Sequence, residues 1–364
     1  MKIHYIAQYA DGKSALSNRK YSLAGVAKMN YIIYCIKELK CDYEVYATSQ
    51  ITKNKYSGIK KYNNIIYRAS FASKNIYQFY FDRLFAIIQL FIYLLTIERD
   101  DTVIVYHERW YSLWVKIAKR LKNWNLIYEV EELYCAVGER TQNHIHNEIE
   151  SLKITNKYIL STVTLAKTLS MSNEANYAVC NGVYMPVFKH DKIVTEKKIH
   201  LLYSGSLNKS KGVIQTIYSV ENLSENFVLH ICGKGSKKEC DQVVDTINQL
   251  NCNCDIIFEG CLSNEDYFNL MKICSIGLCL ANPTAAFPSK IIEYLRNGLS
   301  VISIKKDEIA SADCSKMIVF IDEVSAKTVT QAIENILNSN LSINNYDDLY
   351  RLHSNFIKNL KSLI

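Results

Sequence analysis

Residues 285–303, AAFPSKIIEYLRNGLSVIS, hold side chains suited to binding an anionic ligand that carries hydroxyl groups. Pro288 fits the start of a helix, because its missing N–H costs nothing there. Ser289 and Lys290 in the first turn would offer unpaired N–H groups and a cation to a phosphate. Glu293, one turn further on, would accept hydrogen bonds from hydroxyls of the same ligand. The segment predicts a nucleotide clamp, and the alternative is an ordinary amphipathic helix with Lys and Glu facing solvent.

Three apolar runs that end in glycine precede this segment. They are LLYSGSLNKSKG at 201–212, VLHICGKG at 228–235 and DIIFEGCL at 255–262. Each pattern is typical of a buried strand followed by a tight turn. In their order and spacing, the four units together resemble the nucleotide-sugar domain of glycosyltransferase family 4, which has the GT-B fold. The resemblance is specific over residues 200–303.

The resemblance implies an α/β protein of two doubly wound, Rossmann-like domains with parallel sheets that face a cleft. It assigns Lys211 to the diphosphate of the sugar donor, Glu293 to the ribose and residues 260–262 to the base. The donor-binding residues that it implies are Gly25, Gly205, Ser206, Lys211, Gly233, Gly260, Cys261, Leu262, Ala286, Phe287, Pro288, Ser289, Lys290 and Glu293.

Two positions depart from the family pattern. Relatives usually carry two glutamates with seven residues between them, and the first would fall at Ala285. Either backbone groups of residues 285–287 would then hold the hydroxyls of the transferred sugar, or the donor differs from that of the family. Relatives also often have Arg where this chain has Ser206, which leaves Lys211 and Lys290 to neutralise the diphosphate.

The N-terminal half offers acid–base candidates where two predicted strands, 102–106 and 126–130, end. Ligands of open parallel sheets bind at the carboxyl ends of strands, so His107, Glu131 and Glu132 are candidates. Relatives often place an active-site His where this chain has Glu131, and a carboxylate there would accept the proton of an acceptor hydroxyl. The predicted catalytic residues are Glu131, His107 and Lys211. The alternative is that the two glutamates merely lie on a loop.

Residues 51–97 combine seven Lys or Arg residues, one acid and many aromatic rings. The apolar run 84–97 is too short to span a bilayer core of about 30 Å, which needs about 20 residues. It predicts either a buried helix or an interfacial element in which Lys60, Lys61 and Arg68 meet anionic headgroups. A nucleic-acid partner is not expected, because the net charge of +7 is modest and no nucleic-acid motif is present.

Length and composition predict two domains in 364 residues. We expect an acceptor-side domain at 1–190, a donor-side domain at 191–344 and a last helix at 345–364 that crosses back to the first domain. Gly298 should end the helix that Pro288 begins. Twelve cysteines contain no CxxC pair, and the spacing within 240–261 fits no common zinc pattern.

The sequence therefore predicts a retaining glycosyltransferase that uses a UDP- or GDP-sugar and needs neither a metal nor another cofactor. Its acceptor would be a saccharide or lipid-linked saccharide of a bacterial surface polysaccharide. The absence of a signal peptide predicts a cytoplasmic protein, at the inner face of the plasma membrane if residues 51–97 bind lipid. The alternatives are a nucleotide-sugar epimerase of the same fold and a non-catalytic binding subunit.

Overall fold

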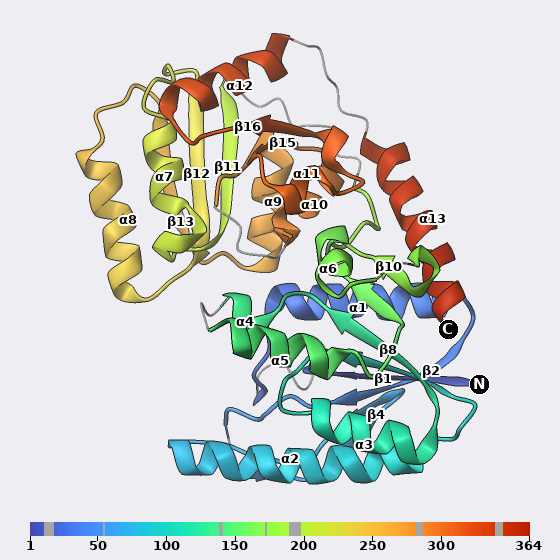
Figure 1. The fold of residues 1–364 in the computed structure, drawn as a ribbon. Coiled ribbons are helices and arrows are strands. Elements are labelled where there is room, and N and C mark those ends of the chain that lie inside the picture. Colours follow the sequence, from blue (N-terminus) through green and yellow to red (C-terminus); the bar gives the residue numbers. More distant parts are fainter. Residues whose placement is uncertain are drawn as a thin grey trace. The chain divides into compact units, whose positions relative to one another are not determined.

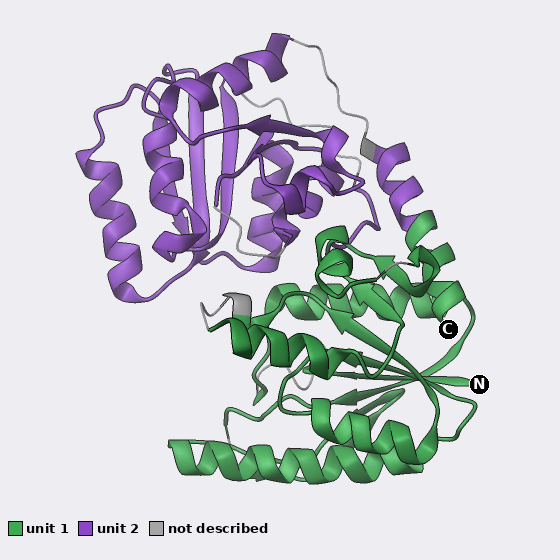
Figure 2. Cartoon of the chain, viewed as in Figure 1, with its two compact units in different colours: residues 1–180, 355–364 green, residues 181–354 purple. Residues whose placement is uncertain are grey.

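The structure, a computed structural model, describes residues 1–10, 18–53, 55–137, 141–171, 173–188, 198–281, 287–338 and 345–364. They form two compact units (Figure 2), Met1–Cys180 with Asn355–Ile364 (unit 1) and Asn181–Ser354 (unit 2). The boundary between the units lies at residue 180, whereas the sequence placed it at residue 190.

The sheet of unit 1 is mostly parallel (Figure 1) and has the order β10-β9-β8-β7-β1-β2-β5-β4. Its direction of winding reverses between β1 and β7, because the chain continues from β1 toward β5 on one side and from β7 toward β10 on the other. β4 is antiparallel to β5. The strands are β1 (Lys2–Ala7), β2 (Asp42–Ala47), β4 (Lys60–Tyr62), β5 (Ile65–Tyr67), β7 (Thr102–Tyr106), β8 (Asn125–Val130), β9 (Tyr158–Leu160) and β10 (Tyr177–Val179), with β3 (Tyr56–Ser57) and β6 (Ser70–Phe71) in a separate antiparallel pair.

The helices of unit 1 follow the strands in the pattern of βαβ units. Leu90, Leu94, Val115 and Ala118 from two of them pack into one apolar core with the sheet. The helices are α1 (Leu23–Glu38), α2 (Ile76–Thr96), α3 (Ser112–Lys122), α4 (Tyr134–Val137), α5 (Gln142–Leu152) and α6 (Val163–Thr168).

Helix α2 is longer than the sequence suggested. The predicted apolar segment began at Leu84, but the helix begins at Ile76, where the side chain of Asn75 accepts a hydrogen bond from the N–H of Gln78 at 2.9 Å. The aromatic residues before Leu84 continue the helical spacing, so the aromatic patch and the apolar run are one element. With 21 residues, α2 is about 31 Å long.

The sheet of unit 2 is entirely parallel and has the order β13-β12-β11-β14-β15-β16. Numbered within the unit, this is the 3-2-1-4-5-6 order of a doubly wound sheet, as the sequence predicted. The strands are β11 (Ile199–Ser206), β12 (Phe227–Lys234), β13 (Asp255–Gly260), β14 (Ile276–Cys279), β15 (Ser300–Ile304) and β16 (Ile318–Ile321). The helices are α7 (Val213–Ser219), α8 (Lys237–Gln249), α9 (Asn264–Ile273), α10 (Ser289–Arg296), α11 (Asp307–Ala310) and α12 (Ala326–Asn338).

The last helix, α13 (Asn345–Leu363), has residues in both units. At its end, the carbonyl oxygen of Leu363 accepts hydrogen bonds from Asn125 Nδ2 at 3.0 Å and from Lys157 Nζ at 2.7 Å. Leu360 and Leu363 are fully buried. The C-terminal segment 355–364 is therefore a structural part of unit 1.

Helix α10 is fixed to the sheet of unit 2 by a tyrosine and a glycine. Tyr294 is fully buried, and a Cβ atom on Gly277 of β14 would lie 2.2 Å from its ring. The hydroxyl of Tyr294 accepts a hydrogen bond from the N–H of Ser204 at 2.8 Å. Gly298, with φ +75°, ends the helix as predicted. This packing holds α10 against β11 and β14.

We predict that Gly277→Ala destabilises unit 2, because the added methyl group must displace the Tyr294 ring. Overpacking of this kind costs about 1–3 kcal/mol, and each kcal/mol lowers Tm by about 2–4 °C in a domain of this size. Thermal unfolding measures the change. The control is Gly58→Ala, whose Cβ would meet only the Tyr56 hydroxyl at 3.9 Å. Equal melting temperatures for the two variants would contradict the packing argument.

Candidate functional site

The second-last residues of strands β11 and β12 are glycines that lie side by side. Gly205 and Gly233 are register partners, and a Cβ atom on Gly233 would lie 1.8 Å from the carbonyl oxygen of Gly205. Only glycine fits at this position. Sheet order reverses between β11 and β14, the place where open α/β sheets bind ligands. The two predicted donor-binding glycines therefore lie near the carboxyl ends of their strands, where a ligand is expected.

Lys211 follows the end of β11 in a short 3-10 helix, Lys209–Lys211, and its side chain is exposed. The hydroxyl of Tyr203 lies 2.8 Å from the carbonyl oxygen of Ser206 and 3.2 Å from that of Lys211. Gly212 then turns the chain into α7 with φ +80°. Tyr203 thus fixes the loop that carries Ser206 and Lys211.

Lys290 and Glu293 form an ion pair on the first turns of α10. Lys290 Nζ lies 2.5 Å from Glu293 Oε2, and both side chains are about one-third exposed or less. The sequence assigned them to separate ligand groups, a phosphate and a ribose. Residues three apart on a helix share a face, so the structure joins them instead. Pro288 is the N-cap residue of α10 rather than a member of its first turn.

A hydrogen-bonded chain runs from this ion pair to the sheet, and we call it the α9–α10 network. Lys290 Nζ donates to the hydroxyl of Tyr267 at 3.2 Å and lies 4.8 Å from the centre of its ring. The Tyr267 hydroxyl bonds Ser204 Oγ at 2.7 Å, and Ser204 Oγ bonds the Tyr294 hydroxyl at 2.9 Å. The network consists of Glu293, Lys290, Tyr267, Ser204 and Tyr294.

Protonation in the α9–α10 network follows from burial and charge. Burial alone would lower the pKa of Lys290, but Tyr267 and the carboxylate of Glu293 outweigh it and hold that pKa above its ordinary value. Burial raises the pKa of Tyr267 to about 12, with the charge of Lys290 opposing the rise. At neutral pH the network therefore contains a protonated lysine and a neutral phenol. Its exposed end offers a cation and carboxylate oxygens to a ligand.

The other predicted donor-side residues fall into three groups. Gly260, the last residue of β13, has φ +67° and is followed by the exposed Cys261 and the half-buried Leu262. Ser289 is exposed at the start of α10, whereas Phe287 is 7% exposed and packs into the unit. Ala285 and Ala286 lie outside the described residues.

His107, at the end of β7, is a structural residue and not an accessible base. Its side chain is 1% exposed, and its Nε2 lies 2.8 Å from Glu148 Oε1. Glu148 also accepts hydrogen bonds from the N–H groups of Tyr134 at 3.0 Å and Cys135 at 2.8 Å. These bonds outweigh burial and lower the pKa of Glu148 to about 2. The ring of His107 therefore ties α4 and α5 to the sheet, and a catalytic role for His107 stays a prediction that this burial does not support.

Glu131, at the end of β8, is held by a lysine that the sequence did not single out. Lys28 Nζ lies 2.5 Å from Glu131 Oε1 and donates to the carbonyl oxygen of Cys180 at 2.6 Å. Glu129 lies two residues earlier, is fully buried and accepts a hydrogen bond from the Tyr5 hydroxyl at 2.6 Å. We call Lys28, Glu129 and Glu131 the Lys28 cluster.

Burial raises the pKa of Glu129 from its ordinary value of 4.5 to about 8, with the charge of Glu131 adding to the rise and Lys28 opposing it. The side chain of Glu131 remains 25% exposed, so it is the member of the cluster that a substrate can reach. Gly25, which the resemblance implied as a donor-binding residue, lies three residues before Lys28 in the first turn of α1.

Metal ligation has no geometric support in the described residues. There, no group of three or more His, Cys, Asp or Glu side chains is arranged to hold a metal ion. None of the twelve cysteines, all within the described part of the chain, forms a disulfide.

Comparison with known proteins agrees with this geometry. Residues 187–360 match the family model described as glycosyl transferases group 1. Together with the fold, this match marks the chain as a GT-B glycosyltransferase. A search of curated protein sequences found no match to this chain.

Solved structures of low identity share the fold over the whole chain. One structure is described as trehalose-6-phosphate from E. coli bound with UDP-2-fluoro glucose. It has 12% identity and a TM-score of 0.62, with 100% of this chain and 96% of that chain covered. A trehalose-6-phosphate synthase has 12% identity and a TM-score of 0.64 with the same coverage. A UDP-forming α,α-trehalose-phosphate synthase from Burkholderia xenovorans, in complex with glucose-6-phosphate, has 10% identity and a TM-score of 0.62, again covering 100% and 96%. The GT-B prediction is confirmed, and the assignment to family 4 stays a prediction.

We predict that Glu129→Gln changes the pH dependence of stability. Since the folded pKa of about 8 exceeds the ordinary 4.5, the folded protein binds more protons than the unfolded chain between these values. Wild-type stability should therefore fall as pH rises from 5 to 8. Gln cannot ionise, so the variant should lack this loss of stability. The difference in free energy of unfolding, variant minus wild type, should therefore be at least about 1.4 kcal/mol larger at pH 8 than at pH 5, the equivalent of one pKa unit.

Urea unfolding at pH 5, 6.5 and 8 measures this change. Glu174→Gln is the matched control, because Glu174 is exposed. Parallel pH profiles for the wild type and Glu129→Gln would show that Glu129 is ionised in the folded protein.

Proposed function

We propose that this glycosyltransferase moves a sugar, with retention of configuration, from a UDP- or GDP-sugar to a saccharide or lipid-linked saccharide. The proposed role is in bacterial surface polysaccharide synthesis, in the cytoplasm. The observation that carries the proposal is the Lys290–Glu293 ion pair, anchored through Tyr267 and Ser204 to the end of β11.

Glu293 is the proposed ribose ligand. Lys290 holds its Oε2 atom, which leaves Oε1 to accept hydrogen bonds from two vicinal hydroxyls. A helix packed on the sheet through Tyr294 keeps this carboxylate rigid, so little conformational entropy is lost when the ligand binds. The partly buried position strengthens each hydrogen bond relative to one in water.

The diphosphate is proposed to lie between Lys211 and the first turn of α10. The N–H groups of that turn and the Lys290 ammonium attract anions, and Lys211 supplies the second charge. Negative charge grows on the diphosphate as the glycosidic bond to the sugar breaks. A cation that contacts the leaving group therefore acts most strongly in the transition state.

Glu131 is the proposed group that accepts the proton of the acceptor hydroxyl. Lys28 fixes Oε1 of this carboxylate, and the 25% of its side chain that is exposed is proposed to meet the acceptor. Glu129 and Lys28 act as positioning residues. We propose that the reaction needs no metal ion, with Lys211 and Lys290 neutralising the leaving diphosphate.

The choice between UDP and GDP rests on the structural neighbours. One of them is bound with UDP-2-fluoro glucose, and another is named as UDP-forming. These names support a UDP-sugar as the first sugar donor to test.

We predict that Glu293→Ala weakens binding of the sugar donor about 10- to 150-fold. Hydrogen bonds to charged groups contribute about 1.5–3 kcal/mol, and 1.4 kcal/mol is a factor of ten in Kd. Calorimetry with a panel of UDP- and GDP-sugars measures the effect. Glu265→Ala, an exposed residue in the first turn of α9, is the control. A Kd for Glu293→Ala equal to that of the control would remove Glu293 from the site.

We predict that Lys211→Ala lowers kcat at least about tenfold and changes the Kd of the sugar donor much less. The reason is that the charge on the leaving diphosphate is largest in the transition state. Release of nucleoside diphosphate under saturating substrate gives kcat. Lys209→Ala, in the same 3-10 helix, is the matched control. If kcat of Lys211→Ala stayed within about twofold of the wild type, Lys211 would have no part in the chemical step.

A further inference from the structure

Helix α2 exposes a continuous apolar stripe. Five side chains spaced four, three, four and four residues apart lie on one face, and each is between 49% and 82% exposed. This spacing places them on one side of a helix. They are Tyr77, Phe81, Leu84, Ile88 and Ile92. The opposite face of α2 is buried through Asp82, Ala86, Leu90 and Leu94.

The neighbouring helix α3 extends this apolar surface. Trp110, just before α3, is 44% exposed, and Leu113 and Leu121 are at least 60% exposed. The Trp110 ring lies 6.1 Å from that of Tyr80, and the guanidinium of Arg83 lies 4.2 Å from its centre. The two helices run side by side on the outer side of unit 1 (Figure 1). We call their exposed side chains the α2–α3 face.

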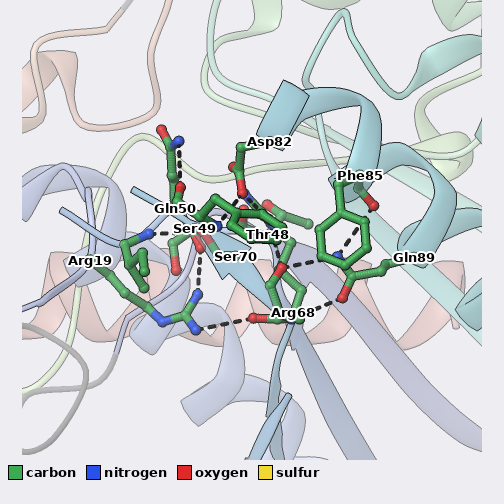
Figure 3. Close-up of polar contacts among 12 residues, drawn as sticks. Arg19, Thr48, Ser49, Gln50, Arg68, Ser70, Asp82, Phe85 and Gln89 are labelled. Carbon is green, nitrogen blue, oxygen red and sulfur yellow. Dashed lines mark hydrogen bonds and ion pairs between the residues drawn. The ribbon is translucent and has the colours of Figure 1, made fainter. Parts of the chain in front are cut away.

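Helix α2 cannot leave unit 1 to span a bilayer without breaking a buried network. In the described residues it is the one helix long and apolar enough to cross a membrane. However, both carboxylate oxygens of Asp82 accept hydrogen bonds from Arg68, at 2.5 and 3.0 Å (Figure 3). Asp82 also accepts a hydrogen bond from the N–H of Phe71 at 2.7 Å. Gln89 exchanges two hydrogen bonds of 2.9 Å with the backbone of Ala69.

This network also corrects a prediction from the sequence. Arg68 was expected among the basic residues that meet lipid headgroups, but its side chain is only 3% exposed. Its charge is matched by Asp82, which is 1% exposed. Arg68 therefore anchors α2 and takes no part in a surface charge.

The charge around the α2–α3 face is positive. Residues 74–96 and 109–124 together contain seven Lys or Arg and one acid, Asp82, which Arg68 neutralises. No acidic residue occurs in α3. Two copies of this chain would repel each other if these faces met, whereas an anionic surface would be attracted. Aromatic and aliphatic side chains flanked by Lys and Arg are typical of helices that lie in a membrane interface.

We propose that the α2–α3 face docks on an anionic lipid bilayer, with α2 lying in the plane of the interface. The stripe from Tyr77 to Ile92 enters the boundary between headgroups and acyl chains. Lys74, Arg83 and Arg120 contact anionic headgroups. This inference concerns a surface of unit 1, whereas the proposed sugar-donor residues Lys211, Lys290 and Glu293 belong to unit 2, and it stands or falls without the proposed transfer reaction.

Vesicle co-sedimentation of the full chain tests the proposal. Binding to vesicles of phosphatidylglycerol and phosphatidylcholine should be strong at low salt and weaken at high salt, because salt screens the headgroup charge. Vesicles of phosphatidylcholine alone should bind at least tenfold more weakly. Tryptophan emission should shift to shorter wavelength on binding, since Trp110 passes from water into the interface.

The decisive variant is Leu84→Glu with Ile92→Glu, which places two charges in the stripe. Both side chains are more than half exposed, so the fold should be kept, and circular dichroism checks this. Binding to anionic vesicles should fall at least tenfold. The matched control is Tyr218→Glu with Ile257→Glu, two exposed apolar residues of unit 2, which should bind like the wild type.

Three outcomes would overturn the proposal. The wild type could fail to bind anionic vesicles at low salt, or the α2 variant could bind as well as the control. Sedimentation equilibrium without lipid could also show a wild-type dimer that the α2 variant dissociates, which would make the face a contact between two copies. None of these measurements uses sugar transfer, so they leave the proposed reaction to its own tests.

Discussion

A lysine ammonium that is buried, like Lys28, or partly buried, like Lys290, needs partners, and this requirement organises the candidate site in each unit. An unpaired buried charge is too costly for a folded protein to keep. In unit 2, Lys290 is satisfied by Glu293, Tyr267 and the ring face of Tyr267. Through Ser204 and Tyr294, the same contacts connect the start of α10 to β11. The polar groups near the end of β11 are therefore held in place before any ligand binds.

Unit 1 uses a similar arrangement at the end of β8. Lys28 is buried and pairs with Glu131, with a second acceptor at the carbonyl oxygen of Cys180. Glu129, two residues before Glu131, is fully buried, and its burial favours the neutral form of its carboxyl group. In both units, a lysine from a helix holds a glutamate near the carboxyl edge of a parallel sheet. Such preorganisation is what transfer chemistry requires, because the protein contributes mainly by positioning groups and stabilising charge.

Much of the fold could be predicted from the sequence, because local patterns determine it. Apolar runs marked the central strands of both sheets, and Gly298, with φ +75°, marked the end of α10. The site was harder to predict, because its contacts join residues far apart in the chain. His107 looked like a base until Glu148, 41 residues later, was seen to bond it. Tyr267 lies 23 residues from Lys290 and carries no local signal of its role. Helix α2 is longer than predicted, because its aromatic first half looks in the sequence like a separate surface patch.

We propose that this chain transfers a sugar from a nucleotide to an acceptor with retention of configuration. The most direct test is NMR of complete reactions with the best-bound nucleotide sugar and a panel of free and polyprenyl-linked saccharides. We expect one nucleoside diphosphate for each new glycosidic bond, and an anomeric configuration equal to that of the sugar donor. An isomerised sugar donor without release of nucleoside diphosphate, or a product of inverted configuration, would contradict it.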